Sequence, residues 1–212
     1  MANEERPSAR SPLDLRPAER VGIFGGSFNP PHVAHLAVAE AARDQVGLDR
    51  VVWIPAAMPP HKQRQDLPAA EHRLAMTRLA VADNAAFGVS DIEIERAGVS
   101  YTVDTVRALQ ETYPEVAFYL LVGGDSFAQF GTWVQPDEIA RRVPLVVYPR
   151  PGADLSNVAP SHMARATMLD RPLLDPSSTA LRRLIRSGRS ARYLVPDAVL
   201  AYIVEYGLYA DG

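Results

Sequence analysis

Short apolar runs typical of β-strands alternate with helical patterns along most of this chain. Most of the runs are nearly continuous in apolar residues, as expected for strands that are covered on both faces. Strand, helix and strand at this spacing predict an α/β fold, Rossmann-like, with a mostly parallel sheet and helices on both faces. We expect strands at 21–24, 51–54, 87–95, 116–122, 144–148 and 166–169, and helices at about 33–46, 69–83, 102–112, 136–142, 178–187 and 197–206.

The length of 212 residues favours one domain with room for a small appendage. Residues 1–19 are rich in proline and charge and lack periodicity, so we expect a disordered tail there. Residues 20–212 then form a single domain, whose C-terminal part, at about 176–209, is a small helical unit.

Composition excludes several classes of protein. The chain has no cysteine, so disulfides and thiolate metal sites are absent. A formal charge of -3 gives no pull toward nucleic acid or an anionic membrane, and we expect neither as a partner. No apolar run approaches the roughly 18 residues of a membrane-spanning helix, and no signal peptide is recognisable. A cytoplasmic protein is expected, and a homo-oligomer is compatible with the sequence.

Ligands of parallel α/β sheets bind beyond the carboxyl ends of the strands, and the segment GIFGGSFNPPHVAH (22–35) follows the first strand. Gly22, Gly25 and Gly26 do not fit the GxGxxG frame of dinucleotide loops, and no Walker lysine follows. The segment instead predicts a strand, a glycine turn, a short loop and a helix. The glycines would permit a close approach of ligand and a positive φ, and the helix N-terminus would attract an anion.

His32 and His35 stand three residues apart at the start of this helix and can point the same way. They could be a surface pair or part of a metal site, but such a site would need carboxylates from elsewhere and no HExxH is present. Their position after the glycine turn favours a role as donors to phosphate.

A second motif, SSTALRRLIRSG, occupies residues 177–188. Hydroxyls at a helix start, followed by Arg182 and Arg183, are typical of a capped basic helix. The same groups suit the tail of a polyphosphate, and the motif alone supports both interpretations equally.

Together, GGSFNPPHVAH and SSTALR resemble the HxGH and ISSTxxR signatures of the nucleotidylyltransferase superfamily. IPAAMPPHK (54–62), SYTVDTV (100–106), GGDSFAQFGTW (123–133) and VVYPRPG (146–152) narrow the resemblance to the bacterial nicotinate-nucleotide adenylyltransferase family, over about residues 20–209. There are two departures. Ala34 replaces the usual glycine, where its methyl group could crowd the nucleotide, and Pro176 replaces isoleucine just before the helix cap.

This resemblance implies adenylyl transfer from ATP to nicotinate mononucleotide, which gives nicotinate adenine dinucleotide (deamido-NAD) and pyrophosphate in NAD biosynthesis. The substrate's phosphate would attack in line without a covalent enzyme intermediate, and Mg²⁺ would accompany ATP, held mostly by phosphates and water. The alternatives are an adenylyltransferase for nicotinamide mononucleotide or phosphopantetheine, a regulatory protein that lost the chemistry, and a dehydrogenase.

The resemblance also implies residue roles. His35, His32 and Arg182 would be catalytic, and none of the predicted residues is a dedicated metal ligand. Trp53 should lie in the core, and His61, His72 and His162 at the surface. The residues expected to bind ATP are Gly25, Gly26, Ser27, Phe28, His32, His35, Asp125, Ser178, Thr179 and Arg182, and those expected to bind the second substrate are Lys62, Tyr101, Thr102 and Trp133.

Overall fold

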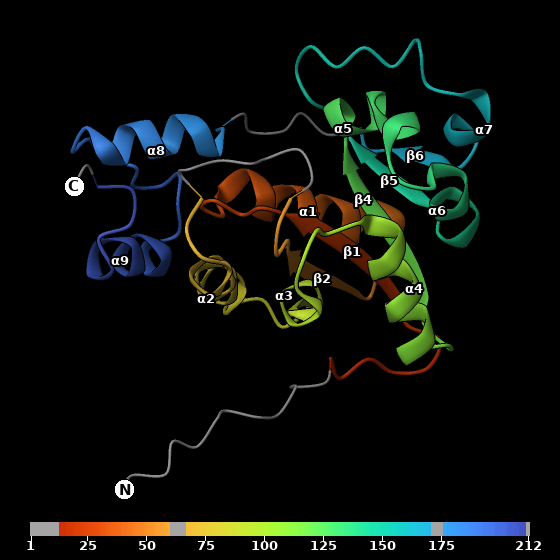
Figure 1. Cartoon of the computed structure of the whole chain (residues 1–212), viewed down its shortest axis with the longest axis horizontal. Helices are drawn as coiled ribbons and strands as arrows, with labels where there is room; N and C mark the ends of the chain where they lie inside the picture. Colours follow the sequence, from red (N-terminus) through yellow and green to blue (C-terminus); the bar gives the residue numbers. More distant parts are fainter. Residues whose placement is uncertain (1–12, 60–66, 171–175, 211–212) are drawn as a thin grey trace, which may run out of the picture.

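The computed structural model describes residues 13–59, 67–170 and 176–210. Six strands form one sheet in the order β3-β2-β1-β4-β5-β6, and every neighbouring pair is parallel, which confirms the predicted Rossmann-like fold (Figure 1). The strands are β1 (Arg20–Gly26), β2 (Arg50–Pro55), β3 (Phe87–Val89), β4 (Ala117–Gly123), β5 (Leu145–Tyr148) and β6 (Ala166–Met168).

Helices connect the strands, and those that the sequence predicted are present within a few residues of their expected ends. The short helices α3, α5 and α7 and the 3₁₀ turn η1 were not predicted. The helical elements are α1 (Val33–Val46), α2 (Ala70–Val81), α3 (Ile92–Arg96), α4 (Thr102–Thr112), α5 (Gly124–Ala128), η1 (Phe130–Thr132), α6 (Pro136–Arg142), α7 (Pro160–Met163), α8 (Ser178–Arg186) and α9 (Asp197–Glu205).

The strand predicted over 87–95 is wrong beyond its first three residues. Only 87–89 pair with β2, and the chain then turns into α3. The pairing with β2 ends at the Ser90 N–H, which donates to the Trp53 carbonyl. The Ser90 hydroxyl then accepts from the Ile92 N–H, a local bond that starts the turn into α3. The alternating pattern of residues 92–96 therefore belongs to one helical turn that buries Glu93.

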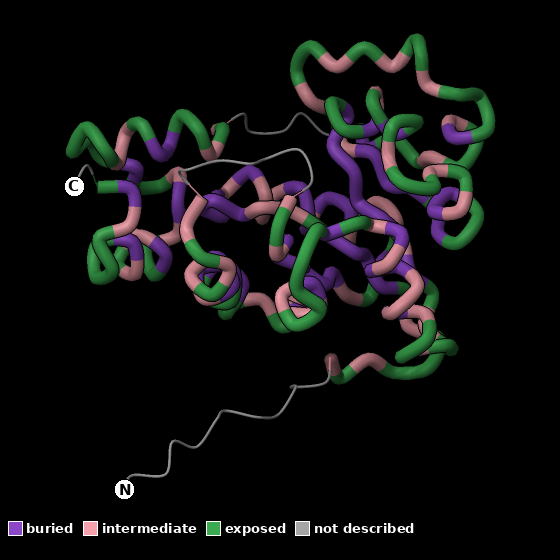
Figure 2. Tube along the Cα trace, viewed as in Figure 1, coloured by how far each residue is buried: buried purple, intermediate pink, exposed green. Residues whose placement is uncertain are grey.

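Side chains alternate between the two faces of the sheet. Helices cover both faces (Figure 1), and the strands between them are largely buried, drawn purple in Figure 2. Phe24, Trp53 and Leu121 pack with α1, α2, α8 and α9. Ile23 and Ile54 pack on the other face with α4 and α6. The prediction of helices on both faces is confirmed, and so is the core position of Trp53, whose side chain has no exposed surface.

The N-terminal segment meets the α4 face of the sheet. Residues 1–12 of the predicted tail lie outside the described residues. From there on, Leu13 and Leu15 pack against the core, and the Ala18 N–H donates to the Glu115 carbonyl at 2.9 Å. In the described ranges, no helix is both long and apolar enough to cross a membrane.

Trp53→Ala tests the importance of the packing behind the β1–α1 turn. The indole contacts the rings of Phe24 and Phe28, with centroids 4.9 and 5.1 Å away. Its removal should lower the free energy of unfolding by about 3–5 kcal/mol, measured by urea denaturation. Val204→Ala, at a side chain that is 80% exposed, should change it by less than about 0.5 kcal/mol. Equal effects of the two substitutions would contradict this packing argument.

Candidate active site

Two cavities lie at the carboxyl ends of the central strands and meet at the turn between β1 and α1. The larger, about 480 Å³, is called here the polar cavity, and the smaller, about 270 Å³, the Trp133 cavity. Gly25, Gly26, Ser27 and Ser126 line both of them. Groups bound in the two cavities would therefore meet at these four residues.

The glycines of this turn provide space rather than an unusual backbone conformation. A Cβ added to Gly25 would meet no atom within 4 Å and would project into the cavities. One added to Gly26 would lie 2.9 Å from the Phe28 ring. The expected positive φ of these glycines is wrong, since Phe28 is the residue of the turn with a positive φ, at 41°. Gly25 thus keeps the shared region open for a ligand.

His32 and His35 form the N-terminal end of α1, and both line the polar cavity. Their rings stack with centroids 3.7 Å apart, and the His32 backbone N–H donates to Nδ1 of His35 at 3.2 Å. That bond makes Nδ1 an acceptor, so a neutral His35 carries its proton on Nε2. Among the described residues, no group of three or more His, Asp or Glu side chains could hold a metal ion, so nothing supports the metal-pair interpretation.

His32 is buried beside a cation that the sequence interpretation overlooked. Burial, and then the positive charge of Arg150, lower the pKa of His32 to about 4, so its ring is neutral at pH 7. Arg150 lines the polar cavity, and its buried Nε has no hydrogen-bond partner among the described residues. Arg150 comes two residues after the end of β5. That position at a strand's carboxyl end is the signal that could have identified it.

The N-terminus of α8 is docked on the loop that follows the glycine turn. Ser177 caps the helix, and its hydroxyl accepts from the Ala180 N–H at 3.2 Å. The Ser178 hydroxyl donates to the Pro30 carbonyl at 3.1 Å, and Nη1 of the buried Arg182 donates to the Asn29 carbonyl at 2.8 Å. Ser177, Ser178, Thr179 and Arg182 line the polar cavity together with His32 and His35, so the structure brings the two sequence motifs to one site.

The two departures from the family pattern leave the cavities intact. Ala34 is buried on α1 and is not among the residues that line either cavity, so its methyl group does not crowd a ligand there. Pro176 lies just before the cap residue Ser177, where a missing N–H breaks no helical hydrogen bond.

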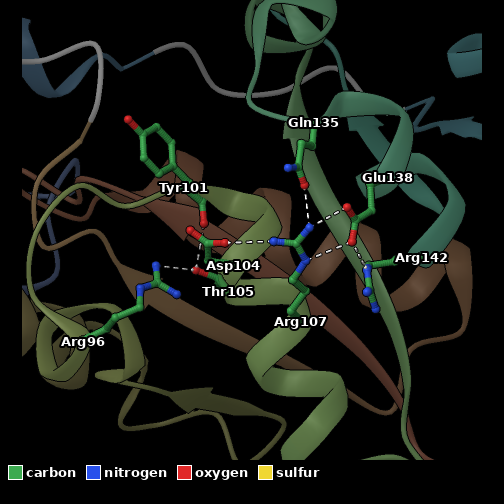
Figure 3. Close-up of polar contacts among 8 residues, drawn as sticks. All are labelled: Arg96, Tyr101, Asp104, Thr105, Arg107, Gln135, Glu138 and Arg142. Carbon is green, nitrogen blue, oxygen red and sulfur yellow. Dashed lines mark hydrogen bonds and ion pairs between the residues drawn. The ribbon is translucent and has the colours of Figure 1, made fainter.

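The Trp133 cavity has polar groups at one wall and an indole at another. Tyr101 is the N-cap residue of α4 and Thr102 begins it, and both line the cavity, so the positive end of this helix dipole lies there. Trp133 is half-buried and lines the same cavity as Tyr101 and Thr102 of the α4 start (Figure 3 shows the Tyr101 end of α4). The half-buried indole leaves surface for a stacked ring, which favours a binding role over core packing alone.

Asp125 and the remaining histidines complete the comparison with the sequence predictions. Asp125 is exposed, lines the polar cavity and accepts from the Ser126 N–H at 2.8 Å.

His72 is half-buried, and its Nδ1 lies 2.9 Å from the Tyr202 hydroxyl. The surface position predicted for His162 is wrong, because α7 buries it with its Nε2 2.7 Å from Asp137 Oδ1. Lys62 and His61 lie outside the described residues, so the role of Lys62 stays a prediction.

Arg73 was not predicted either, although it connects three segments around the site. Its guanidinium is fully buried and donates to the backbone carbonyls of Ser27 at 3.2 Å, Ala57 at 3.0 Å and Pro68 at 3.1 Å. Burial lowers the pKa of Arg73. In the sequence it occupies an ordinary position of a helical pattern, and no local signal distinguishes it from the other arginines.

These features define the class of protein. Residues 23–184 match the cytidylyltransferase-like family model, and the chain belongs to that family of nucleotidyltransferases. Within it, the chain is 54% identical to the "probable nicotinate-nucleotide adenylyltransferase" of Salinibacter ruber over 89% of its own length and 97% of the relative's. It is 46% identical to the protein of the same name from Exiguobacterium sibiricum, over 90% and 99% of the two chains. It is therefore a member of the nicotinate-nucleotide adenylyltransferase family.

The solved structures agree on the fold. The nicotinic acid mononucleotide adenylyltransferase of Plasmodium falciparum, complexed with NaAD, aligns with a TM-score of 0.75 over 90% of this chain and 97% of that one. The two sequences are only 18% identical, so this likeness supports the shared fold and no residue role.

The burial of His32 predicts a specific pH dependence of stability. Its folded-state pKa of about 4 lies below the 6.5 of an ordinary histidine. Between these values the unfolded chain binds a proton that the folded one does not. The stability due to a neutral His32 is thus fully present above about pH 6.5 and is lost as the pH falls toward 4.

In this window, the free energy of unfolding should fall with decreasing pH more steeply for the wild type than for His32→Gln. The difference in slope should approach about 1.4 kcal/mol per pH unit. Urea denaturation of both proteins at several pH values measures it, and the two slopes should coincide above about pH 7. Parallel curves throughout would mean that His32 titrates normally in the folded protein.

Proposed function

We propose that this protein transfers the adenylyl group of ATP to nicotinate mononucleotide and releases nicotinate adenine dinucleotide and pyrophosphate. The observation that carries the proposal is the meeting of the two cavities at Gly25, Gly26, Ser27 and Ser126. ATP phosphates in the polar cavity and a pyridine nucleotide in the Trp133 cavity would have their reacting phosphates at this junction.

The polar cavity offers the donors that a triphosphate needs. The N-termini of α1 and α8 each present the positive end of a helix dipole. His35 would donate its Nε2–H to the α-phosphate, supported by His32. Ser178, Thr179 and Arg182 would hold the β- and γ-phosphates, and Asp125 would bind a ribose hydroxyl. Gly25, Gly26, Ser27 and Phe28 form the wall against which the phosphates lie.

The Trp133 cavity suits a nicotinate ring. The indole provides a stacking surface, and the N-terminus of α4 at Tyr101 and Thr102 would receive the ring carboxylate. A helix N-terminus stabilises an anion by about 0.3–1 kcal/mol at an exposed site and up to about 2 kcal/mol when it is partly buried. An acid should therefore be preferred to the corresponding amide.

The reaction needs no protein nucleophile. A phosphate oxygen of the mononucleotide, already anionic at pH 7, forms the new bond to the α-phosphorus of ATP as the bond to pyrophosphate breaks on the opposite side. The electron pair of the broken bond leaves with pyrophosphate. Catalysis then consists of holding two anions in line and stabilising the charge that develops, through hydrogen bonds from His35 and the cationic guanidiniums of Arg182 and Arg150.

The polar cavity also fits Mg²⁺ carried by ATP. Asp125 is the only carboxylate among the described residues that line this cavity. Mg²⁺ in such enzymes is typically held by one or two carboxylates, substrate phosphates and water, so a multi-residue protein cage is not needed. ATP phosphates and water would hold most of the ion near Asp125, and the ion neutralises negative charge on the phosphates when it is bound. Because ATP is the proposed donor, we also place the reaction in the cytoplasm.

The decisive experiment measures pyrophosphate release from ATP with nicotinate or nicotinamide mononucleotide, with and without Mg²⁺. Release should require a mononucleotide and Mg²⁺. The value of kcat/KM should be about 5- to 30-fold higher for the acid, equivalent to about 1–2 kcal/mol. Equal values for the two substrates would contradict the acid-specific site, and no release with either would overturn the proposed function.

His35→Ala tests the phosphate contact. Loss of the Nε2–H donor should lower turnover by at least about 100-fold, or about 2.7 kcal/mol of barrier, while circular dichroism shows a folded protein. His72 lines neither cavity, so His72→Ala should keep turnover within about twofold. A folded His35→Ala protein with near-normal turnover would rule out the phosphate role.

A further inference from the structure

Strands β1, β2 and β4 contribute residues to the lining of the Trp133 cavity, and two of its walls belong to elements outside the sheet. One wall is the N-terminus of α4, with Tyr101 and Thr102, and another is the segment from η1 to α6, with Trp133 and Val134. A ring stacked on Trp133 can place a carboxylate at the α4 N-terminus only if the two walls stay at a fixed separation. Some interaction between α4 and α6 must therefore maintain the width of the cavity.

Arg107 of α4 makes that connection (Figure 3). Its Nε donates to Oε1 of Glu138 at 2.9 Å, and its Nη2 donates to the other carboxylate oxygen, so the guanidinium and carboxylate pair as a two-pronged fork. Nη1 donates to Asp104 Oδ1 at 3.3 Å on its own helix, and Nη2 also donates to Oε1 of Gln135. Arg107 itself is not among the residues that line the cavity.

Gln135 has a backbone conformation that needs support. Its φ of 53° and ψ of 54° lie in the left-handed region, which is uncommon for a residue other than glycine. A following proline, here Pro136, further disfavours a helical backbone at Gln135. Such a conformation costs on the order of 1–3 kcal/mol and persists only where the surroundings hold it. The turn lies two residues after Trp133, so the bond from Arg107 to Gln135 steadies the segment that carries the indole.

The Arg107–Glu138 fork has the features of an ion pair that can hold two helices in a fixed arrangement. The two side chains are only 33% and 22% exposed, and Nε of Arg142 donates to the same carboxylate at 2.7 Å. Isolated surface ion pairs contribute little, but forked geometry within a network is stronger and directional. Hydrogen bonds from Arg107 and then Arg142 lower the pKa of Glu138 to about 2, so the carboxylate stays charged at any pH at which the protein would be assayed.

We propose that Arg107 is a positioning residue for the pyridine nucleotide, which fixes the separation between Trp133 and the N-terminus of α4 without touching the substrate. This inference rests on the proposed function, because it assigns a specificity role within that site. The competing possibility is that Arg107 only fastens α4 to α6, in which case its removal would lower stability and leave substrate binding unchanged.

Steady-state kinetics of Arg107→Ala separate the two roles. The KM for nicotinate mononucleotide should rise by at least about 10-fold, while the KM for ATP and kcat stay within about threefold. Arg107→Lys should also raise the mononucleotide KM by at least about threefold, since an ammonium keeps the charge but cannot form the fork. Arg141→Ala is the matched control on α6, because that side chain takes part in none of these bonds, and it should leave both KM values unchanged.

A second comparison tests the role of the strained turn. Glycine adopts a positive φ without strain, so Gln135→Gly should make the turn less dependent on Arg107. In the Gln135→Gly background, Arg107→Ala should then raise the mononucleotide KM by no more than about threefold. An equal rise in both backgrounds would overturn the part of Gln135 in this mechanism.

The outcomes are distinguishable from failure of the proposed function. If the wild type turns over nicotinate mononucleotide but Arg107→Ala shows an unchanged KM, the positioning role is overturned and the function stands. If the wild type shows no turnover, both fall. If Arg107→Ala does not fold, Glu138→Gln removes the charge but keeps an acceptor, and it must show the same selective rise in the mononucleotide KM or the proposal is wrong.

Discussion

The site depends on the N-terminal ends of helices, where the positive end of each helix dipole lies. A helix in a parallel α/β sheet begins where a strand has just ended, so its first-turn donors lie at the carboxyl edge of the sheet. Here α1 begins after the β1 turn, and α4 begins at the same edge before it returns to β4. The N-terminus of α8 is added from the end of the chain. Three helix N-termini thus surround a site that, by our proposal, takes two anionic substrates.

Side-chain contacts hold α8 in place, because α8 follows the last strand and does not connect two strands of the sheet. Asn29, buried after the glycine turn, takes a bond from Arg182 at its carbonyl and one from the Tyr209 hydroxyl at Oδ1, at 2.6 Å. The two donors come from α8 and from the segment after α9. Asn29 therefore attaches α8 and the segment after α9 to the loop that follows the glycine turn. Arg182 thus has a structural role in addition to any contact with a ligand. Arg73 likewise attaches the segments after β2 to the glycine turn, because it donates to the carbonyls of Ala57 and Pro68 as well as to that of Ser27.

Much of this arrangement was predictable because it follows from local patterns. Apolar runs and helical periodicity located the six strands and the long helices. The rule that ligands bind at strand ends drew attention to the segment with Gly25 and His35, and the family resemblance added Asp125. What could not be predicted depends on tertiary contacts. Glu93 belongs to a strand-like pattern, yet it is buried in a helical turn where it accepts from the Thr105 hydroxyl at 2.6 Å. His162, Arg73 and Arg107 are ordinary residues in the sequence, and only packing gives them partners.

The two cavities differ in the source of their positive charge. In the polar cavity, His32 is neutral and the permanent positive charge comes from Arg150 and Arg182, which lie on different elements. An anion entering there meets both guanidinium groups. The described residues that line the Trp133 cavity include no arginine or lysine, so by our proposal the α4 dipole attracts the acid there, and it acts only over about the first turn. Discrimination between an acid and an amide is therefore sensitive to the distance between ring and helix, which is why a residue that sets that distance can control specificity without contacting the substrate.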